Sequence, residues 1–413
     1  IGALFLVLSL LEESGYMQRA AFIMDRSMRK LGLSGQAFIP LVVGLGCNIP
    51  AVLAARTLPD PKVRIMTTMM TPFMSCSARL TVYVLFATAF FADYATLLVF
   101  SLYLIGILAA ILTALLLKHT LLKGEPQSLL MELPIYHKPA VTNIVLNTHN
   151  KMKGFLLGAG KIIVIVVLLI NFLNSMGTDG SFGHQNQNDS VLSQAAQFAT
   201  PVVEPLGITE DNWPATVGII TGVLAKEVVV GALDNLYQTM DTPSTQDRSL
   251  PEVEELALTE KLYQAAATIP ENGKQLFQDM LDPLGLSQLD TINAPEQTVA
   301  ELPVATRTLD KMVNYFEGEI GAYAYLLLIL LYFPCVATFA AIRSELGWGW
   351  ALSSAGWSLF LGYSTSVGFY QAMTFSQHPM AASAWLIGFS LAYFALFLGL
   401  KRLNILTNAR RYA

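Results

Sequence analysis

Hydrophobic residues gather along this chain into long runs that short polar loops separate. A membrane-spanning helix needs about 20 consecutive, mostly apolar residues. Runs near that length occur at roughly 1–24, 36–54, 65–92, 95–117, 154–175, 213–237, 322–343, 350–373 and 380–400. Of the 413 residues, 54% are hydrophobic and 13% are charged, whereas about 25% are charged in a typical soluble domain. The pattern therefore predicts an all-α, polytopic membrane protein.

The distribution of basic residues predicts how these segments cross the membrane. Cytoplasmic loops carry an excess of Lys and Arg. Such residues lie at 25–35, 56–64 and 118–153 and in the C-terminal tail. Loop 176–212 has none, which favours an external location. Segment 36–54 would then begin and end inside, and segment 213–237 would begin and end outside. Because glycines interrupt both, we expect two re-entrant broken-helix hairpins and seven full crossings.

The order of these elements repeats. A span, a hairpin, a Pro-Cys span and a further span occur within 1–117 and again, in the opposite orientation, within 154–373. Inverted repeats with matching broken elements place a binding site near mid-membrane, where the halves meet. The expected units are a first gate repeat (1–118), a cytoplasmic linker with an interfacial helix (119–153), the two parts of a second gate repeat (154–240 and 316–373), an acidic external insertion (241–315), and a last transmembrane helix with a basic cytoplasmic tail (374–413).

The motif Gly44-Leu45-Gly46-Cys47-Asn48-Ile49-Pro50 marks the expected break of the first hairpin. Glycine raises the entropic cost of a helix, and proline lacks an N–H and clashes with the carbonyl four residues back. Opened backbone at membrane depth survives only when it is buried in protein or lines a wet cavity. Transporters build ion sites at such breaks. We expect the helix to open near Cys47 and leave carbonyls beside a thiol and an amide, as a cation site.

The three cysteines, Cys47, Cys76 and Cys335, lie at broken or Pro-marked points of apolar segments. A buried cysteine is usually a small hydrophobe, but three in matched places favour a pathway. Thiolates suit iron, zinc or copper(I) better than magnesium or calcium. A carboxylate in apolar sequence is costly and marks a functional hypothesis. Further candidate ligands or charges are Asn48, Ser75, Ser77, Glu13 and Glu227.

Enzyme motifs are absent from the sequence. Gly160-Lys161 and Gly273-Lys274 do not complete a phosphate-binding loop, and there is no Gly-x-Ser-x-Gly or His-Glu-x-x-His. We therefore expect no enzymatic activity from this chain. The sequence opens within an apolar run and without an initiator Met, which indicates that an N-terminal part is missing.

Six motifs, in order along the chain, resemble the bacterial ferrous iron transport protein B (FeoB) family. The acidic insertion has no clear match. The motifs are Glu12-Glu13-Ser14-Gly15-Tyr16-Met17, the Gly44–Pro50 segment followed by Ala55-Arg56-Thr57, Pro72-Phe73-Met74-Ser75-Cys76-Ser77-Ala78-Arg79, Met131-Glu132-Leu133-Pro134-Ile135-Tyr136-His137, Ala225-Lys226-Glu227-Val228-Val229-Val230-Gly231 and Ser376-Gln377-His378-Pro379.

The resemblance implies a multi-pass importer of Fe(II) in the bacterial inner membrane, with Cys47 and Cys76 lining the first gate and Cys335 the second. It implies an N-terminal GTP-binding domain outside this chain, so GTP would bind there and no cofactor here. Implied partners are Fe(II), the lipid bilayer, that GTPase domain, small cytosolic accessory proteins and further copies in a homo-oligomer, without nucleic acid.

Two other hypotheses stay open. The same scaffold would serve a permease for zinc, manganese or a nucleoside-like solute. A nucleoside site needs aromatic and amide contacts, so neutral Cys→Ser substitutions would favour it. The second alternative, a receptor or assembly subunit that conducts nothing, predicts no flux in proteoliposomes.

Overall fold

The computed structural model describes residues 2–122, 136, 138–177, 190–224, 226, 228–239 and 306–412. Over these ranges the secondary structure is helical, apart from an isolated bridge between Gly177 and Ser190. The all-α expectation is confirmed there. Glu227 and residues 241–305 of the expected insertion lie outside the described residues.

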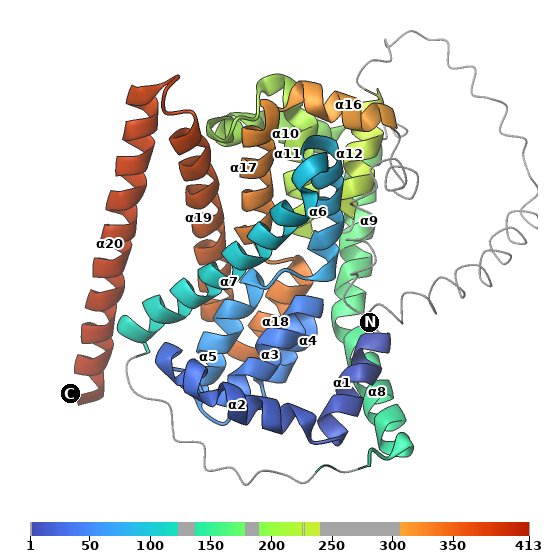
Figure 1. Ribbon diagram of the computed structural model, residues 1–413, viewed down its shortest axis with the longest axis vertical. Coiled ribbons are helices and arrows are strands. Elements are labelled where there is room, and N and C mark those ends of the chain that lie inside the picture. Colours follow the sequence, from blue (N-terminus) through green and yellow to red (C-terminus); the bar gives the residue numbers. More distant parts are fainter. Residues whose placement is uncertain are drawn as a thin grey trace, which may run out of the picture.

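The first part of the chain forms short helices at the lower end of the molecule and longer ones that rise from it (Figure 1). Asp60 and Pro61 start one of the longer helices, because the Asp60 carboxylate accepts the N–H of Lys62 at 2.8 Å and proline suits the first turn. The elements are α1 (Gly2–Glu13), α2 (Tyr16–Leu31), η1 (Gly35–Ala37), α3 (Phe38–Gly46), α4 (Asn48–Ala55), α5 (Pro61–Met70), η2 (Thr71–Phe73), α6 (Ser77–Phe90), η3 (Ala92–Tyr94) and α7 (Ala95–His119).

Segment 1–24, expected as a single span, is divided into α1 and α2. Gly15 has φ 77°, in the left-handed region, and no helix continues through it. α2 then lies across the lower end of the molecule (Figure 1) and ends at Gly32, with φ 84°. Glycine at these two positions gives the chain a bend that the apolar pattern alone does not reveal.

The second part of the chain repeats the alternation of short and long helices (Figure 1). The π-helical turn η4 joins α8 to α9, within the expected linker and span. The elements are α8 (Val141–Phe155), η4 (Leu156–Gly160), α9 (Lys161–Ser175), α10 (Val191–Val203), η5 (Glu204–Leu206), η6 (Glu210–Asn212), α11 (Trp213–Leu224), α12 (Val228–Thr239), α16 (Thr306–Tyr315), α17 (Gly318–Leu331), α18 (Val336–Leu346), α19 (Trp348–Met373) and α20 (Pro379–Tyr412).

Four helical stretches of the described residues are long and apolar enough to cross a membrane: 61–90, 92–119, 318–346 and 379–402. The chain is thus a multi-pass membrane protein. Stretch 61–90 contains α5, η2 and α6, and stretch 318–346 contains α17 and α18. Each is interrupted near its middle, the first at Met74–Cys76 and the second at Tyr332–Cys335. Both interruptions therefore belong at mid-membrane depth.

Two helical hairpins accompany the broken helices. In the first, a Cβ on Gly44 of α3 would lie 3.6 Å from the Cβ of Ala51 on α4. In the second, Cβ atoms on Gly218 and Gly222 of α11 would lie 3.0 and 2.8 Å from side-chain atoms of Leu233 and Val229 on α12. The glycines let the arms of each hairpin approach closely, so segments 36–54 and 213–237 are hairpins, as expected.

The two sets of elements run in opposite vertical directions in Figure 1. α5 leads upward to α6, whereas α17 leads downward to α18, and the hairpin α3–α4 lies low whereas α11–α12 lies high. This arrangement agrees with an inverted repeat. The repeat itself, the number of crossings and the domain boundaries stay predictions.

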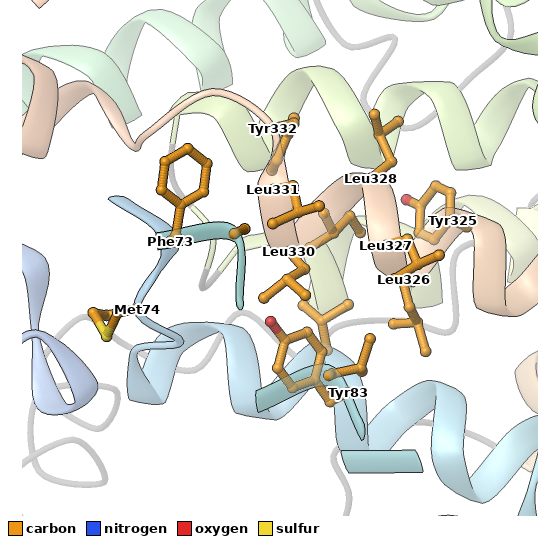
Figure 2. Packing of buried hydrophobic residues seen from close by; sticks show 14 of the residues in the cluster. Phe73, Met74, Tyr83, Tyr325, Leu326, Leu327, Leu328, Leu330, Leu331 and Tyr332 are labelled. Carbon is orange, nitrogen blue, oxygen red and sulfur yellow. The ribbon is translucent and has the colours of Figure 1, made fainter. Parts of the chain in front are cut away.

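One buried cluster joins the halves between α6 and α17. The ring centroids of Phe86 and Tyr325 are 5.0 Å apart, and Phe316 packs against both rings at 5.4 Å. Figure 2 shows Tyr83 of α6 in the same cluster as Leu330 of α17 and Tyr332, the residue that follows α17. This packing connects the first broken stretch to the second.

Candidate functional site

All three cysteines occupy the position directly before a helix that starts inside the molecule. Cys47 precedes α4, Cys76 precedes α6 and Cys335 precedes α18, and each thiol is half-buried and without a disulfide. Each has extended backbone dihedrals or ψ near 150° and makes no side-chain cap hydrogen bond. The breaks that the sequence predicts at Cys47 and at the two Pro-Cys segments are therefore present, and a cysteine marks each.

Two carbonyl groups beside Cys47, those of Gly44 and Gly46, have side-chain donors. Pro50 has no N–H for the carbonyl of Gly46, and the Ser77 hydroxyl donates to that oxygen instead, at 3.3 Å. With its side-chain oxygen and nitrogen exchanged, as the surrounding donors and acceptors require, the Asn48 amide donates to Gly44 at 2.9 Å and to Thr71 at 3.2 Å. The expectation of free carbonyls beside the thiol therefore changes for these two groups, which Asn48 and Ser77 satisfy.

Because these oxygen atoms already accept hydrogen bonds, a cation site here would depend mainly on sulfur ligands. Helix N-termini present N–H groups and partial positive charge, which favour anions rather than cations. The Ser75 hydroxyl lies 3.4 Å from the hydroxyl of Tyr83, and Cys335 Sγ lies 3.0 Å from the Thr338 hydroxyl. A cation held at the three N-termini would therefore depend on the sulfur atoms of Cys47, Cys76 and Cys335.

Cys47 and Cys335 are far apart in the sequence, yet both pack against one small apolar cluster, which contains Phe5 of α1, Ile49 of α4 and Phe155 of α8. The breaks that carry these two cysteines therefore share one cluster.

The helices that follow these cysteines, α4 and α18, run side by side. Val52 of α4 packs with Ile342 of α18, and Arg56 Nε lies 3.7 Å from a carboxylate oxygen of Glu345 near their C-terminal ends. The cysteines lie at one end of this pair and the ion pair at the other, so the two helices are parallel.

Cys76 reaches the same region through its neighbour Ser77, which bonds to the carbonyl next to Cys47. Within the described ranges, however, no group of three or more His, Cys, Asp or Glu side chains lies close enough to hold a metal ion. The cysteines border one region without forming a closed metal cage, and their role as ligands stays a prediction.

The predicted carboxylates lie apart from the thiols or outside the described residues. Asn143 of α8 donates to Glu13 at 2.8 Å, and Lys151 of α8 donates to Glu12 at 2.6 Å. Glu12 is thus paired with Lys151. α1 connects this acidic end to the apolar cluster at Phe5. Glu227 is not among the residues that the structure describes.

Each break rests against a glycine of the next long helix. A Cβ on Gly106 of α7 would lie 2.7 Å from the carbonyl oxygen of Phe73, and a Cβ on Gly362 of α19 would lie 2.8 Å from the backbone nitrogen of Tyr332. Such distances leave no room for a side chain. These two glycines, which the sequence analysis did not single out, give the two halves a further matching feature.

Two cationic side chains near the breaks are deeply buried. Arg79 of α6 is 0% exposed, and Lys226, beside the second hairpin, is 4% exposed, with Nζ 4.8 Å from the centroid of the Tyr332 ring. The apolar sequence around both residues is the signal that could have indicated this burial. Arg79 takes part in none of the ion pairs among the described residues.

Comparison with known proteins gives two family matches. The model of the Gate family, described as nucleoside recognition, matches residues 1–90 and 156–349, which include all three cysteines. A model described as the ferrous iron transport protein B C terminus matches residues 99–151.

Curated relatives match along most of the chain. It is 44% identical over 379 residues to the Fe(2+) transporter FeoB of Escherichia coli strain K12, and equally to those of Shigella flexneri and Salmonella typhimurium strain LT2. These alignments cover 92% of this chain and 47% of each relative, so the chain spans about half the length of the relatives that it matches. No solved structure matches.

Proposed function

Because this chain belongs to the ferrous iron transport protein B family, we propose that it is the permease part of a Fe(II) importer in the bacterial inner membrane. Fe(II) is the substrate and passes between the two gates. The chain catalyses no reaction in this proposal. GTP acts on the N-terminal domain that the resemblance implies, and small accessory proteins and further copies of the chain are expected partners.

The observation that carries the proposal is the convergence of two broken helices, each with a cysteine, at mid-membrane depth. Cys76 ends the break near the middle of stretch 61–90, and Cys335 ends the break near the middle of stretch 318–346. Cys47 shares an apolar cluster with Cys335. Fe(II) is a borderline cation that thiolates bind well, and broken helices at this depth are where transporters hold ions.

In the finer form of the proposal, sulfur lines the gates and carboxylates supply charge on either side. Cys47, Cys76 and Cys335 contact the ion in turn. Asn48, Ser75 and Ser77 hold the breaks in shape and offer oxygens when the gates open and their present hydrogen bonds are released. Glu13 receives the ion at the end of α1 away from the thiols, and Glu227 acts in the second half.

A nucleoside permease is the second candidate, because the Gate family model carries the description nucleoside recognition. Tyr332, at the second break, and Tyr325, two turns earlier in α17, are aromatic groups of the kind that such a solute requires. Both are fully buried against α11, however, and Tyr325 already donates to the carbonyl of Ala215 at 3.0 Å. The three cysteine thiols therefore favour a metal ion over a nucleoside as the substrate.

Radioactive Fe(II) uptake into proteoliposomes tests the proposal. The native, full-length protein is reconstituted under anaerobic, reducing conditions with GTP, and vesicles without protein serve as the control. We expect saturable uptake, competition by excess Zn(II) at the same thiols, and no competition by adenosine or uridine. Absence of uptake by the full-length protein would reject the importer, and competition by the nucleosides alone would favour the second candidate.

A further inference from the structure

Arg79 is a charged side chain placed where a membrane protein rarely tolerates one. It lies three positions after Cys76, near the middle of the candidate span 61–90, and is 0% exposed. Nη1 donates to the carbonyl of Met74 at 3.2 Å. Nε and Nη2 have no hydrogen-bond partner among the described residues. A buried guanidinium that uses so few of its donors is costly, and an ionisable residue at this depth is functional by default.

The surroundings of Arg79 connect the two gates. Tyr83, one turn further along the same helix, and Tyr332, at the break of the second gate, belong to one buried cluster. The Lys226 ammonium lies 4.8 Å from the centroid of the Tyr332 ring, and this lysine is 4% exposed. Each half of the chain therefore contributes one buried cationic side chain beside this cluster.

No carboxylate of the described residues is paired with Arg79. The ion pairs among those residues are Arg29–Asp25, Arg56–Glu345 and Lys151–Glu12, and Arg79 takes part in none of them. The guanidinium therefore places a positive charge close to Cys76, and this charge disfavours a cation at that thiol.

We propose that Arg79 is the electrostatic barrier that keeps the shut gate impermeable to cations, including protons and potassium ions. Arginine side chains exclude cations and protons from other pores in this way. The inference rests on the proposed function, since a barrier is needed only where a cation path exists. Opening requires the guanidinium to leave the level of Cys76 before Fe(II) reaches the thiol.

Cation leak in the absence of iron tests the barrier. The full-length protein is reconstituted without nucleotide or Fe(II), a potential is imposed with a potassium gradient and valinomycin, and proton entry is followed with a pH-sensitive dye. Arg79→Met, which keeps an unbranched apolar stem but removes the charged guanidinium, should leak protons at least tenfold faster than the unchanged protein. Arg79→Lys should stay within about twofold of the unchanged protein, because the charge remains; a tenfold change corresponds to about 1.4 kcal/mol of barrier.

Arg64→Met is the matched control. Arg64 is half-buried on α5, in the same candidate span, and its Nε also lacks a partner among the described residues, but it lies near the end of that span. Its variant should leak no more than the unchanged protein. Equal leak in Arg79→Met and Arg64→Met would overturn the proposal. If Arg79→Met does not fold, Arg79→Gln replaces it, with the same tenfold expectation and the same overturning result.

Thermal unfolding separates the barrier from a structural role. Removing an unpaired buried charge should leave the Tm unchanged or raise it. A lower Tm in both Arg79→Met and Arg79→Lys, without leak, would make the residue structural and overturn the proposal. Fe(II) uptake, measured on the same vesicles, keeps the two claims apart. Leak in Arg79→Met with no Fe(II) uptake by the unchanged protein rejects iron transport alone, whereas normal uptake without leak rejects the barrier alone.

Discussion

Serine at any two of positions 47, 76 and 335 is expected to reduce Fe(II) uptake at least tenfold, which corresponds to about 1.4 kcal/mol of lost stabilisation. The physical reason is that each cysteine stands at a helix N-terminus, where the backbone offers N–H groups and no carbonyl oxygens. Two carbonyls beside Cys47, those of Gly44 and Gly46, accept hydrogen bonds from Asn48 and Ser77. A hydroxyl is a harder and weaker ligand than a thiolate, so serine does not replace the sulfur.

The measurement is uptake into proteoliposomes by Cys47→Ser/Cys335→Ser, Cys76→Ser/Cys335→Ser and Cys47→Ser/Cys76→Ser proteins. Met74→Leu is the control, because Met74 is a buried apolar residue at the start of the break in stretch 61–90 and the exchange nearly conserves volume. It should change uptake less than twofold. Normal uptake in all three double variants would reduce the thiols to packing groups and transfer the site to Asn48, Glu13 and Glu227.

Alanine at Gly362 or Gly106 is expected to cost about 1–3 kcal/mol of stability, as overpacking does in other cores, and to abolish uptake. The methyl group on Gly362 would lie 2.8 Å from the nitrogen of Tyr332 and 3.0 Å from the carbonyl carbon of Leu331. The methyl group on Gly106 would lie 2.7 Å from the carbonyl oxygen of Phe73. Because these are backbone atoms, the clash with the new methyl group is removed only if the broken segments shift. Such a shift would also displace the cysteines that follow them.

Gly356 and Gly368 supply the comparison, because they lie in the same helix as Gly362 and a Cβ on either meets nothing within 4 Å. Alanine there should leave the Tm unchanged or raise it, since glycine costs a helix about 0.5–1 kcal/mol relative to alanine. Thermal unfolding in detergent and Fe(II) uptake are measured for all four variants. Equal Tm values for all four alanine variants would mean that the close contacts of Gly106 and Gly362 with the broken segments do not contribute to stability.

The large features of the fold follow from the sequence because they depend on local chemistry. Apolar runs identify the membrane-spanning stretches, and glycines in two of them predict the hairpins at 36–54 and 213–237. Pro50 and the Pro-Cys segments locate the breaks, since proline removes a donor wherever it stands. The family resemblance of the motifs is confirmed by the matches to known proteins.

Other features depend on partners far away in the chain, and local pattern does not contain them. Hydropathy continues through Gly15, but the left-handed backbone there divides the first segment. The side chains of Asn48 and Ser77 could coordinate a metal ion or donate a hydrogen bond to a carbonyl. The sequence does not decide between these roles, whereas the fold shows them as donors to the carbonyls of Gly44 and Gly46. Glu13 likewise meets Asn143, 130 positions later. The ligand roles of the thiols and carboxylates stay predictions.

The most direct test of the central claim is the iron K-edge X-ray absorption spectrum of the full-length protein loaded anaerobically with Fe(II). The account predicts sulfur atoms in the first coordination shell of the bound iron, and a loss of that sulfur signal in the Cys47→Ser/Cys335→Ser protein. A shell of oxygen and nitrogen alone, unchanged by that substitution, would contradict the claim that the cysteines of the two gates carry the ion.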